Sequence, residues 1–156
     1  MIYPTQSKNI FFTATIFDVA KYVLHKIGRI NTWKLQKLCY YSQAWQIAWT
    51  GKSIFNEDFE AWANGPVCPE LFNEHRAMFS VDENDISKGD AKHLTEDEKE
   101  SVDVVLKDYG ELEPYVLREL SHKEAPWKDA RGSLPEGAKC QTIITKLSMG
   151  EYYGSL

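Results

Sequence analysis

The feature that most constrains the fold is a segment at residues 32–49 that has helical spacing and is apolar on nearly every side. Leu38, Trp45 and Trp49 fall on one face at intervals of three to seven residues, with Tyr41 and Ala48 beside them. Tyr40, Ala44 and Ile47 extend the apolar surface round the back. A helix of this kind belongs inside a domain. We therefore predict a central helix around which the rest of the chain packs.

The remaining strip of this segment is polar but uncharged. It consists of Gln36, Ser42, Gln43 and Gln46. A buried amide without a hydrogen bond costs about 1–3 kcal/mol. We expect these side chains to have partners within the core.

Further helices are indicated by apolar spacing and by residues typical of helix ends. We expect helices at residues 15–27, 69–79, 95–109, 114–121 and 126–131, and a last helical turn at 148–153. Thr15 can cap the first and Gly28 can end it, and Thr95 with Glu98 forms a capping box. Pro69 suits the first position of its helix.

Extended segments are few. Residues 1–12 look extended, 59–62 alternate as in a short strand, Asn64-Gly65-Pro66 reads as a turn, and 140–145 could pair with 59–62. The predicted fold is mainly α: a compact single-domain helical bundle around a central aromatic-rich helix, with a small two- or three-stranded antiparallel sheet. With 156 residues, 43% of them hydrophobic, residues 1–156 are expected to form one domain.

Composition excludes several classes of protein. A net charge of −5 disfavours a general nucleic-acid binder. The longest uncharged run, 38–51, is too short and too polar for a membrane helix. The three cysteines, Cys39, Cys68 and Cys140, form no C-x-x-C pair. We read them as reduced thiols of a cytoplasmic protein.

The charge is unevenly distributed. Residues 82–113 carry twelve acids and four lysines, a net charge of −8, so the remainder sums to +3. The simpler interpretation is a solvated acidic face. The alternative is a docking surface for a basic partner.

The segment 121–131 combines one Trp, one Pro, one His and five charged residues. His122 and Glu124 could form the acid–base pair of a hydrolase-like enzyme. Alternatively, they fix a turn around Trp127, with Arg131 paired to Glu124 or a nearby carboxylate. The histidines and cysteines lack the paired spacing of a metal site, so no metal or cofactor is expected.

The first two helices, joined by residues 28–31, could also form a helix-turn-helix that reads DNA. The second of them would then need an exposed polar face. Its aromatic residues instead favour burial, so DNA binding remains the weaker alternative.

Three blocks of sequence, taken in order, resemble a known family. The first is Lys34 to Tyr41 with Gln43-Ala44-Trp45, the second is Glu60 to Trp62 leading into Gly65 to Leu71, and the third runs from Leu120 to Arg131. Together they are similar to the SocA-like, Panacea-domain antitoxins, also described as GepA-type phage-associated proteins, over residues 16–153. The chain departs from the family pattern at Cys39, at Asn64 and across 132–142.

The resemblance implies an antitoxin encoded beside its toxin in a mobile element or prophage. Its partner would be the cognate protein toxin, neutralised by direct binding, through masking or through delivery to a protease. No catalytic, metal or cofactor residues are implied. The motif cluster, structural or partner-binding, comprises Lys34, Gln36, Lys37, Tyr40, Tyr41, Trp62, Gly65, Pro66, Val67, Glu70, Ser121, His122, Lys123, Glu124, Pro126, Trp127 and Arg131. Among these, the candidates for one polar network joining the three blocks are Lys34, Lys37, Glu70, His122, Glu124 and Arg131.

Overall fold

The computed structural model describes residues 14–156, which form seven α-helices and two small antiparallel sheets. The helices are α2 (Ile16–Ile27), α3 (Thr32–Thr50), α4 (Pro69–His75), α5 (Glu96–Tyr109), α6 (Pro114–Lys123), α7 (Ala125–Arg131) and α8 (Lys146–Gly154). The predicted extended conformation of 1–12 lies outside the described residues. The mainly α fold is confirmed.

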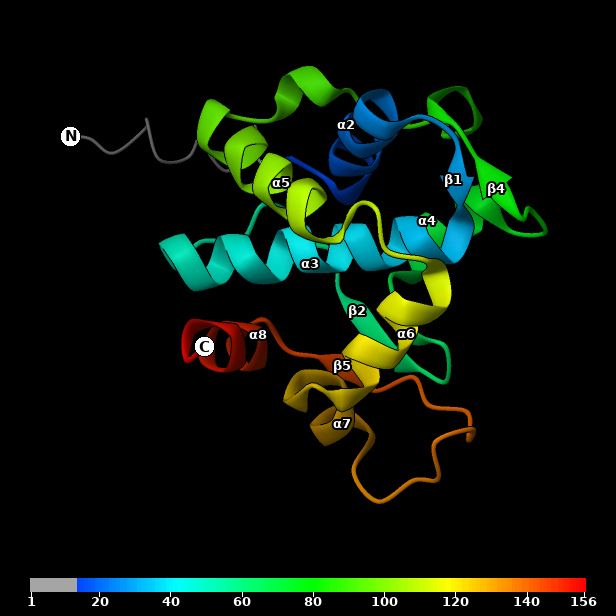
Figure 1. Ribbon diagram of the computed structural model, residues 1–156, viewed down its shortest axis with the longest axis vertical. Coiled ribbons are helices and arrows are strands. Elements are labelled where there is room, and N and C mark those ends of the chain that lie inside the picture. The colour runs from blue at the N-terminus through cyan, green and yellow to red at the C-terminus, as the bar shows by residue number, and fades with distance from the viewer. Residues whose placement is uncertain (1–13) are drawn as a thin grey trace.

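Helix α3 crosses the middle of the molecule, with α2 and α5 on one side and α8 on the other (Figure 1). Most of its side chains are buried, including Leu35, Leu38 and Tyr41, each fully shielded from solvent. Asn31 caps its start, and Gly51 ends it in the left-handed region at φ 76°. The prediction of a central aromatic-rich helix is confirmed.

The larger sheet has the order β3-β2-β5. Strand β2 (Phe59–Trp62) lies between β3 (Gly65–Val67) and β5 (Ile143–Ile144), with Glu60 opposite both Val67 and Ile143. This confirms the predicted pairing of 59–62 with the segment 140–145. A second, two-stranded sheet joins β1 (Ile30–Asn31) to β4 (Ser80–Val81).

Each side chain of the polar strip of α3 forms at least one hydrogen bond. The Gln43 amide binds Ile54 N and Phe55 O at 2.7 Å each, and Gln46 Oε1 accepts from Ser101 Oγ at 2.6 Å. Gln36 accepts from Cys68 N at 2.9 Å, and Ser42 donates to Leu38 O within the helix. The expected partners therefore exist, and they link α3 to three separate segments.

Several expected boundaries differ from the structure, among them the end of α6, which lies at Lys123 rather than 121. The helix predicted at 69–79 ends at His75, because Ala77 has a positive φ of 68° and Phe79 O accepts from Thr32 N beside the β1–β4 pair. Phe79 is consequently 91% exposed. In the predicted turn Asn64-Gly65-Pro66, only Asn64 is in the turn, since Gly65 and Pro66 begin β3. The last helix begins at Lys146 rather than 148.

Two short 3-10 turns, Glu83–Asp85 and Ala91–His93, occupy the stretch that follows β4. Within residues 14–156, no helix is both long and apolar enough to cross a bilayer.

Candidate functional site

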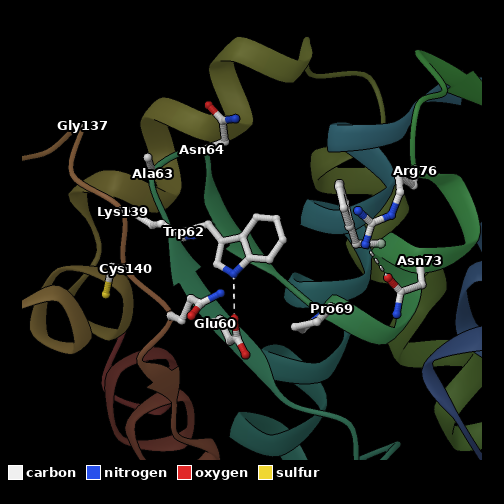
Figure 2. Close-up of a pocket in the computed structure, with 12 residues that line it drawn as sticks. Glu60, Trp62, Ala63, Asn64, Pro69, Asn73, Arg76, Gly137, Lys139 and Cys140 are labelled. Atoms are coloured by element: carbon white, nitrogen blue, oxygen red, sulfur yellow. Dashed lines mark hydrogen bonds between the residues drawn. The ribbon is translucent and has the colours of Figure 1, made fainter.

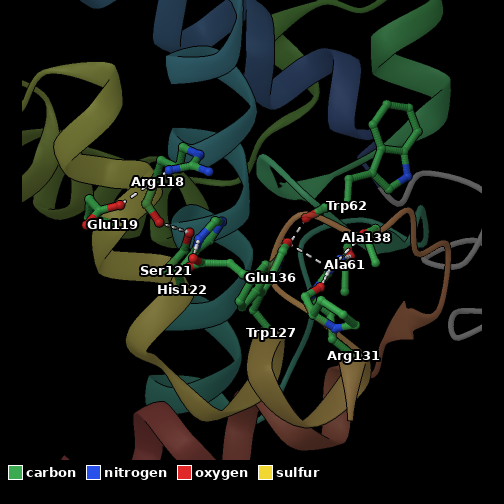
Figure 3. Close-up of polar contacts among 11 residues, drawn as sticks. Ala61, Trp62, Arg118, Glu119, Ser121, His122, Trp127, Arg131, Glu136 and Ala138 are labelled. Carbon is green, nitrogen blue, oxygen red and sulfur yellow. Dashed lines mark hydrogen bonds and ion pairs between the residues drawn. The ribbon is translucent and has the colours of Figure 1, made fainter. Parts of the chain in front are cut away.

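The three sequence blocks meet at the end of the sheet below α3. Trp127 Nε1 donates to Trp62 O at 2.9 Å, and Arg131 donates to Ala61 O at 2.8 Å, joining the third block to the second (Figure 3). Tyr41 donates to Glu124 at 2.7 Å, joining the first to the third. Helices α6 and α7 pack against the strands of this sheet, which buries Ser121 and Pro126 and holds the third block in place.

The Trp127 indole organises the segment 121–131. The His122 ring stacks on it with centroids 3.8 Å apart and planes 6° apart, and the Arg131 guanidinium lies 4.8 Å from its centroid. Trp127 itself is only 4% exposed. The ring is therefore held in one orientation by a stack, a cation–π contact and a hydrogen bond.

Arg131 does not pair with a carboxylate, contrary to one sequence-based interpretation. Its Nη1 donates to Ala61 O, and its Nη2 lies 2.7–2.8 Å from the carbonyl oxygens of Pro135, Glu136 and Ala138 (Figure 3). A planar guanidinium can satisfy several acceptors at once. Arg131 thus fixes the loop that follows α7 against the edge of the sheet.

His122 and Glu124 do not form an acid–base pair. Glu124 Oε1 accepts 2.7 Å hydrogen bonds from Tyr41 and Tyr153, whereas His122 Nδ1 lies 3.0 Å from Glu136 Oε2. Burial raises the pKa of Glu124, opposed by the two tyrosine bonds, and burial lowers the pKa of His122. His122 lines an open pocket of about 490 Å³, but Glu124 is not part of its wall.

Lys37 is the most unusual member of the motif cluster. It is 1% exposed, and its Nζ has no hydrogen-bond partner among residues 14–156. Burial, reinforced by the nearby Arg118, lowers the pKa of Lys37 to about 7. Gly65 makes room for its stem, since a Cβ at that position would lie 2.5 Å from Lys37 Cε and 3.1 Å from Ser121 Oγ.

The remaining motif residues divide into core and surface. Tyr40, Val67 and Pro66 are buried, Lys34 is half-buried, and Glu70 and Lys123 are exposed. Two candidates for the polar network do join blocks, Glu124 through Tyr41 and Arg131 through Ala61 O. Among residues 14–156, however, no hydrogen bond or ion pair links one of the six candidates directly to another, so the joints run through tyrosine hydroxyls and backbone carbonyls.

Three other kinds of site find no geometric support in the part of the chain that the structure describes: a DNA-reading helix, a thiolate nucleophile and a metal centre. Helix α3 is covered by α5 and α8, so it offers no free face to a DNA groove. Burial raises the pKa of the Cys68 thiol to about 12, which disfavours a thiolate nucleophile. Among residues 14–156, no three His, Cys, Asp or Glu side chains are grouped to hold a metal ion.

A pocket of about 610 Å³ lies on the outer side of the sheet; we call it the Trp62 pocket. The Trp62 indole stands between α4 on one side and the loop 137–141 on the other (Figure 2). Its Nε1 donates to Glu60 at 2.8 Å, and its ring meets Phe72 edge-on at 5.2 Å. Pro69, Asn73, Arg76 and Lys139 complete much of the wall.

Sequence reasoning found Trp62 but missed Phe72, Arg76 and Lys139. Phe72 and Arg76 are four residues apart on one side of α4 and its end, and the Arg76 guanidinium lies 5.1 Å from the Phe72 ring. That spacing was a detectable signal. Lys139 gave none, because its loop is brought to the sheet by contacts of Arg131 and His122 that the sequence does not show.

The family described as "Antitoxin SocA-like, Panacea domain" matches residues 35–128, more than half of the chain and most of the three blocks. The chain belongs to this antitoxin family. No curated protein and no solved structure gives a significant match. Membership in the SocA-like family implies a cognate toxin as partner.

Proposed function

We propose that this SocA-like chain neutralises its toxin by direct protein–protein contact, and that the Trp62 pocket is the centre of the contact surface. The supporting observation is the composition of the wall. Trp62 and Arg76 belong to residue types that dominate binding energy at protein interfaces, and Phe72 belongs to the aromatic types that are enriched there. They stand on a sheet and a helix, so the surface is ordered before the partner arrives.

The apolar centre has a polar rim. Glu60, Asn73 and Lys139 surround the two aromatic rings and offer hydrogen-bonding groups to a partner (Figure 2). A buried aromatic centre with a polar rim is the usual anatomy of a specific interface. A stable complex would bury at least about 1,200 Å² in total, so the contact must extend beyond this pocket.

The acidic stretch 82–113 is a second possible contact. Asp97, Glu100 and Asp103 are exposed on α5, but Asp103 already accepts a 2.8 Å hydrogen bond from Tyr22. Charge in this position would steer a basic partner rather than hold it. We assign it a kinetic role in the encounter, secondary to the Trp62 pocket.

Binding at this pocket fits masking of the toxin as the mode of neutralisation. The toxin gene is expected beside this one, as in a mobile element or prophage, and both proteins would meet in the cytoplasm. Delivery to a protease would require toxin loss in the cell. Masking instead leaves toxin levels unchanged when the two are co-expressed.

The test is co-expression of this chain with the product of the neighbouring gene, followed by growth measurement and co-purification. Trp62→Ala is expected to weaken the complex at least tenfold and to abolish protection. Trp49→Ala is the matched control, because Trp49 is 48% exposed at the far end of α3 and lies outside the pocket. Circular dichroism must show that both variants are folded.

Two outcomes would refute the proposal. A neighbour that is harmless and does not co-purify would remove direct neutralisation altogether. If both variants still form a complex of native affinity, the contact surface does not include Trp62. Immunoblotting of the toxin during co-expression separates masking from degradation.

A further inference from the structure

A smaller pocket, of about 140 Å³, lies next to the Trp62 pocket, and its chemistry is different. We call it the Lys37 pocket. Its wall is formed by Asn31, Trp33, Lys37, Asn64, Pro114, Tyr115 and Arg118. It thus contains two cations, two primary amides and two aromatic rings, and no carboxylate.

The ammonium of Lys37 is buried in this wall without a partner. Nζ has no hydrogen-bond acceptor among the described residues, and the Trp33 ring, with its centroid 5.6 Å away, supplies only a weak cation–π contact. A buried charge is normally paired with an opposite charge. The charged group that acts on Lys37 most strongly is another cation, Arg118.

Other groups of the pocket are also ready to meet an anion. The side chain of Arg118 is 41% exposed, and its one carboxylate contact, Glu119 at 3.3 Å, lies at the surface. Asn31 Oδ1 accepts from the amides of Trp33 and Lys34, which leaves its NH2 group as a donor. Asn64 is exposed at the mouth.

Two helix dipoles add to this positive potential. Asn31 caps α3, and Pro114 is the first residue of α6, so both helices begin at the pocket (Figure 1). A helix N-terminus carries about half a positive charge. These dipoles strengthen an anion site that is already defined by the unpartnered Lys37 ammonium and the half-exposed Arg118 guanidinium.

We propose that the Lys37 pocket binds one carboxylate group, presented by an acidic side chain of the bound toxin. This inference rests on the proposed function. The pocket volume of about 140 Å³ suits the carboxylate group of an Asp or Glu side chain. Asn64 lines both pockets, so a polypeptide lying on Trp62 passes the mouth of the Lys37 pocket. The carboxylate would then contact Arg118 and the two amides and supply the counter-charge that Lys37 lacks.

The first experiment uses acetate as the probe and the free chain, so it is independent of any toxin. Two-dimensional NMR follows the side-chain signals of Lys37 and Arg118 during an acetate titration, with chloride at equal ionic strength as reference. We expect saturable shifts with a dissociation constant on the order of 1–10 mM. Lys37→Met should abolish them, and Arg118→Gln should weaken them severalfold.

Lys107→Met is the matched control, because Lys107 is an exposed lysine on α5, outside this wall. It should bind acetate as the native chain does. Absence of saturable shifts in the native chain would overturn the carboxylate site. Inorganic phosphate binding more than tenfold tighter than acetate would also overturn it, in favour of a free oxyanion.

The second experiment tests the source of the carboxylate in the complex. Arg118→Gln should weaken toxin binding about tenfold, and removal of one acidic toxin residue should weaken the native complex equally but the Arg118→Gln complex no further. Native-like affinity in both Lys37→Met and Arg118→Gln would overturn the inference while leaving the proposed function intact. Failure of the native chain to bind would instead refute the proposed function, and acetate would still decide the site.

Discussion

Replacing Lys37 by Met should stabilise the fold at neutral pH. Methionine has nearly the length of the lysine stem and can occupy the space that Gly65 leaves open. The change removes a buried ammonium without a hydrogen-bond partner in the described structure. Replacing even a buried ion pair by apolar side chains of similar volume is often stabilising by about 1–4 kcal/mol, and Lys37 lacks the partner that such a pair has.

The size of the gain follows from the shifted pKa. Lys37 has an ordinary pKa of 10.5 in the unfolded chain and a pKa of about 7 when buried. Each pH unit between these values corresponds to about 1.4 kcal/mol of linkage free energy. At pH 7 the unfolded chain is almost fully protonated at Lys37 and the folded chain about half, so the native fold loses at most about 4 kcal/mol. We expect Lys37→Met to recover about 2–4 kcal/mol.

The gain should shrink as pH rises. Between pH 7 and 10.5 the unfolded state binds more protons than the folded state, so this lysine makes stability increase with pH. Above pH 10.5 Lys37 no longer lowers the free energy of unfolding, because the side chain is neutral in both the folded and the unfolded state. Below pH 7 both are charged and the cost is constant. Burial of Cys39 and Cys68 raises the pKa values of their thiols, so these two groups make stability decrease with pH above about pH 9. That effect is common to both proteins and cancels in the difference.

The assay is urea unfolding, followed by tryptophan fluorescence, at pH 7, 8, 9 and 10 in buffers free of carboxylate and phosphate. The free-energy difference between Lys37→Met and the native chain should fall by about 1.4 kcal/mol per pH unit. Lys107→Met should show no such trend. A variant that is less stable at pH 7, or a difference that does not change with pH, would refute the reasoning.

Three further substitutions test the joints between the blocks. Glu124→Ala should cost about 2–4 kcal/mol in thermal or urea unfolding, because two buried tyrosine hydroxyls lose their acceptor, whereas Glu124→Gln should cost less than half of that. Gly65→Ala should cost about 2–3 kcal/mol, from the positive φ of 109° and the Lys37 clash, and at least 1 kcal/mol less in a Lys37→Ala background; additive costs would contradict the contact. Trp127→Ala should cost about 3–5 kcal/mol by calorimetry, and a near-neutral shift would mean that the ring is not a packing centre.

Local signals predicted the central helix, most helix ends and the pairing of β2 with β5. They worked because α3 is apolar on most sides, and because Thr15, Thr95 and Gly51 are strong caps. The short sheet β1–β4 was missed, since a two-residue strand has no periodicity. Its pairing is what ends α4 at His75 rather than at 79.

The candidate sites were less predictable, because each depends on contacts between distant segments. Lys37 has nothing in its own neighbourhood that indicates burial; Gly65 and Ser121 create its chamber. Arg131 was expected to pair with a carboxylate because charged residues can be read from a sequence. The backbone carbonyl oxygens that Arg131 binds instead cannot be identified without the fold. The need for glutamine partners was predictable, but their identity was not.

Helix α8 has a consequence for the order in which the molecule is completed during translation. Tyr153 of α8 donates to Glu124 and packs beside Tyr40. The interior of the bundle is therefore incomplete until α8, which is translated after the other helices, has been made. Until then Glu124 lacks one of its two hydroxyl donors, and one flank of α3 is open to water. The core around Glu124 and Tyr40 should therefore be completed only once residues 146–154 have docked.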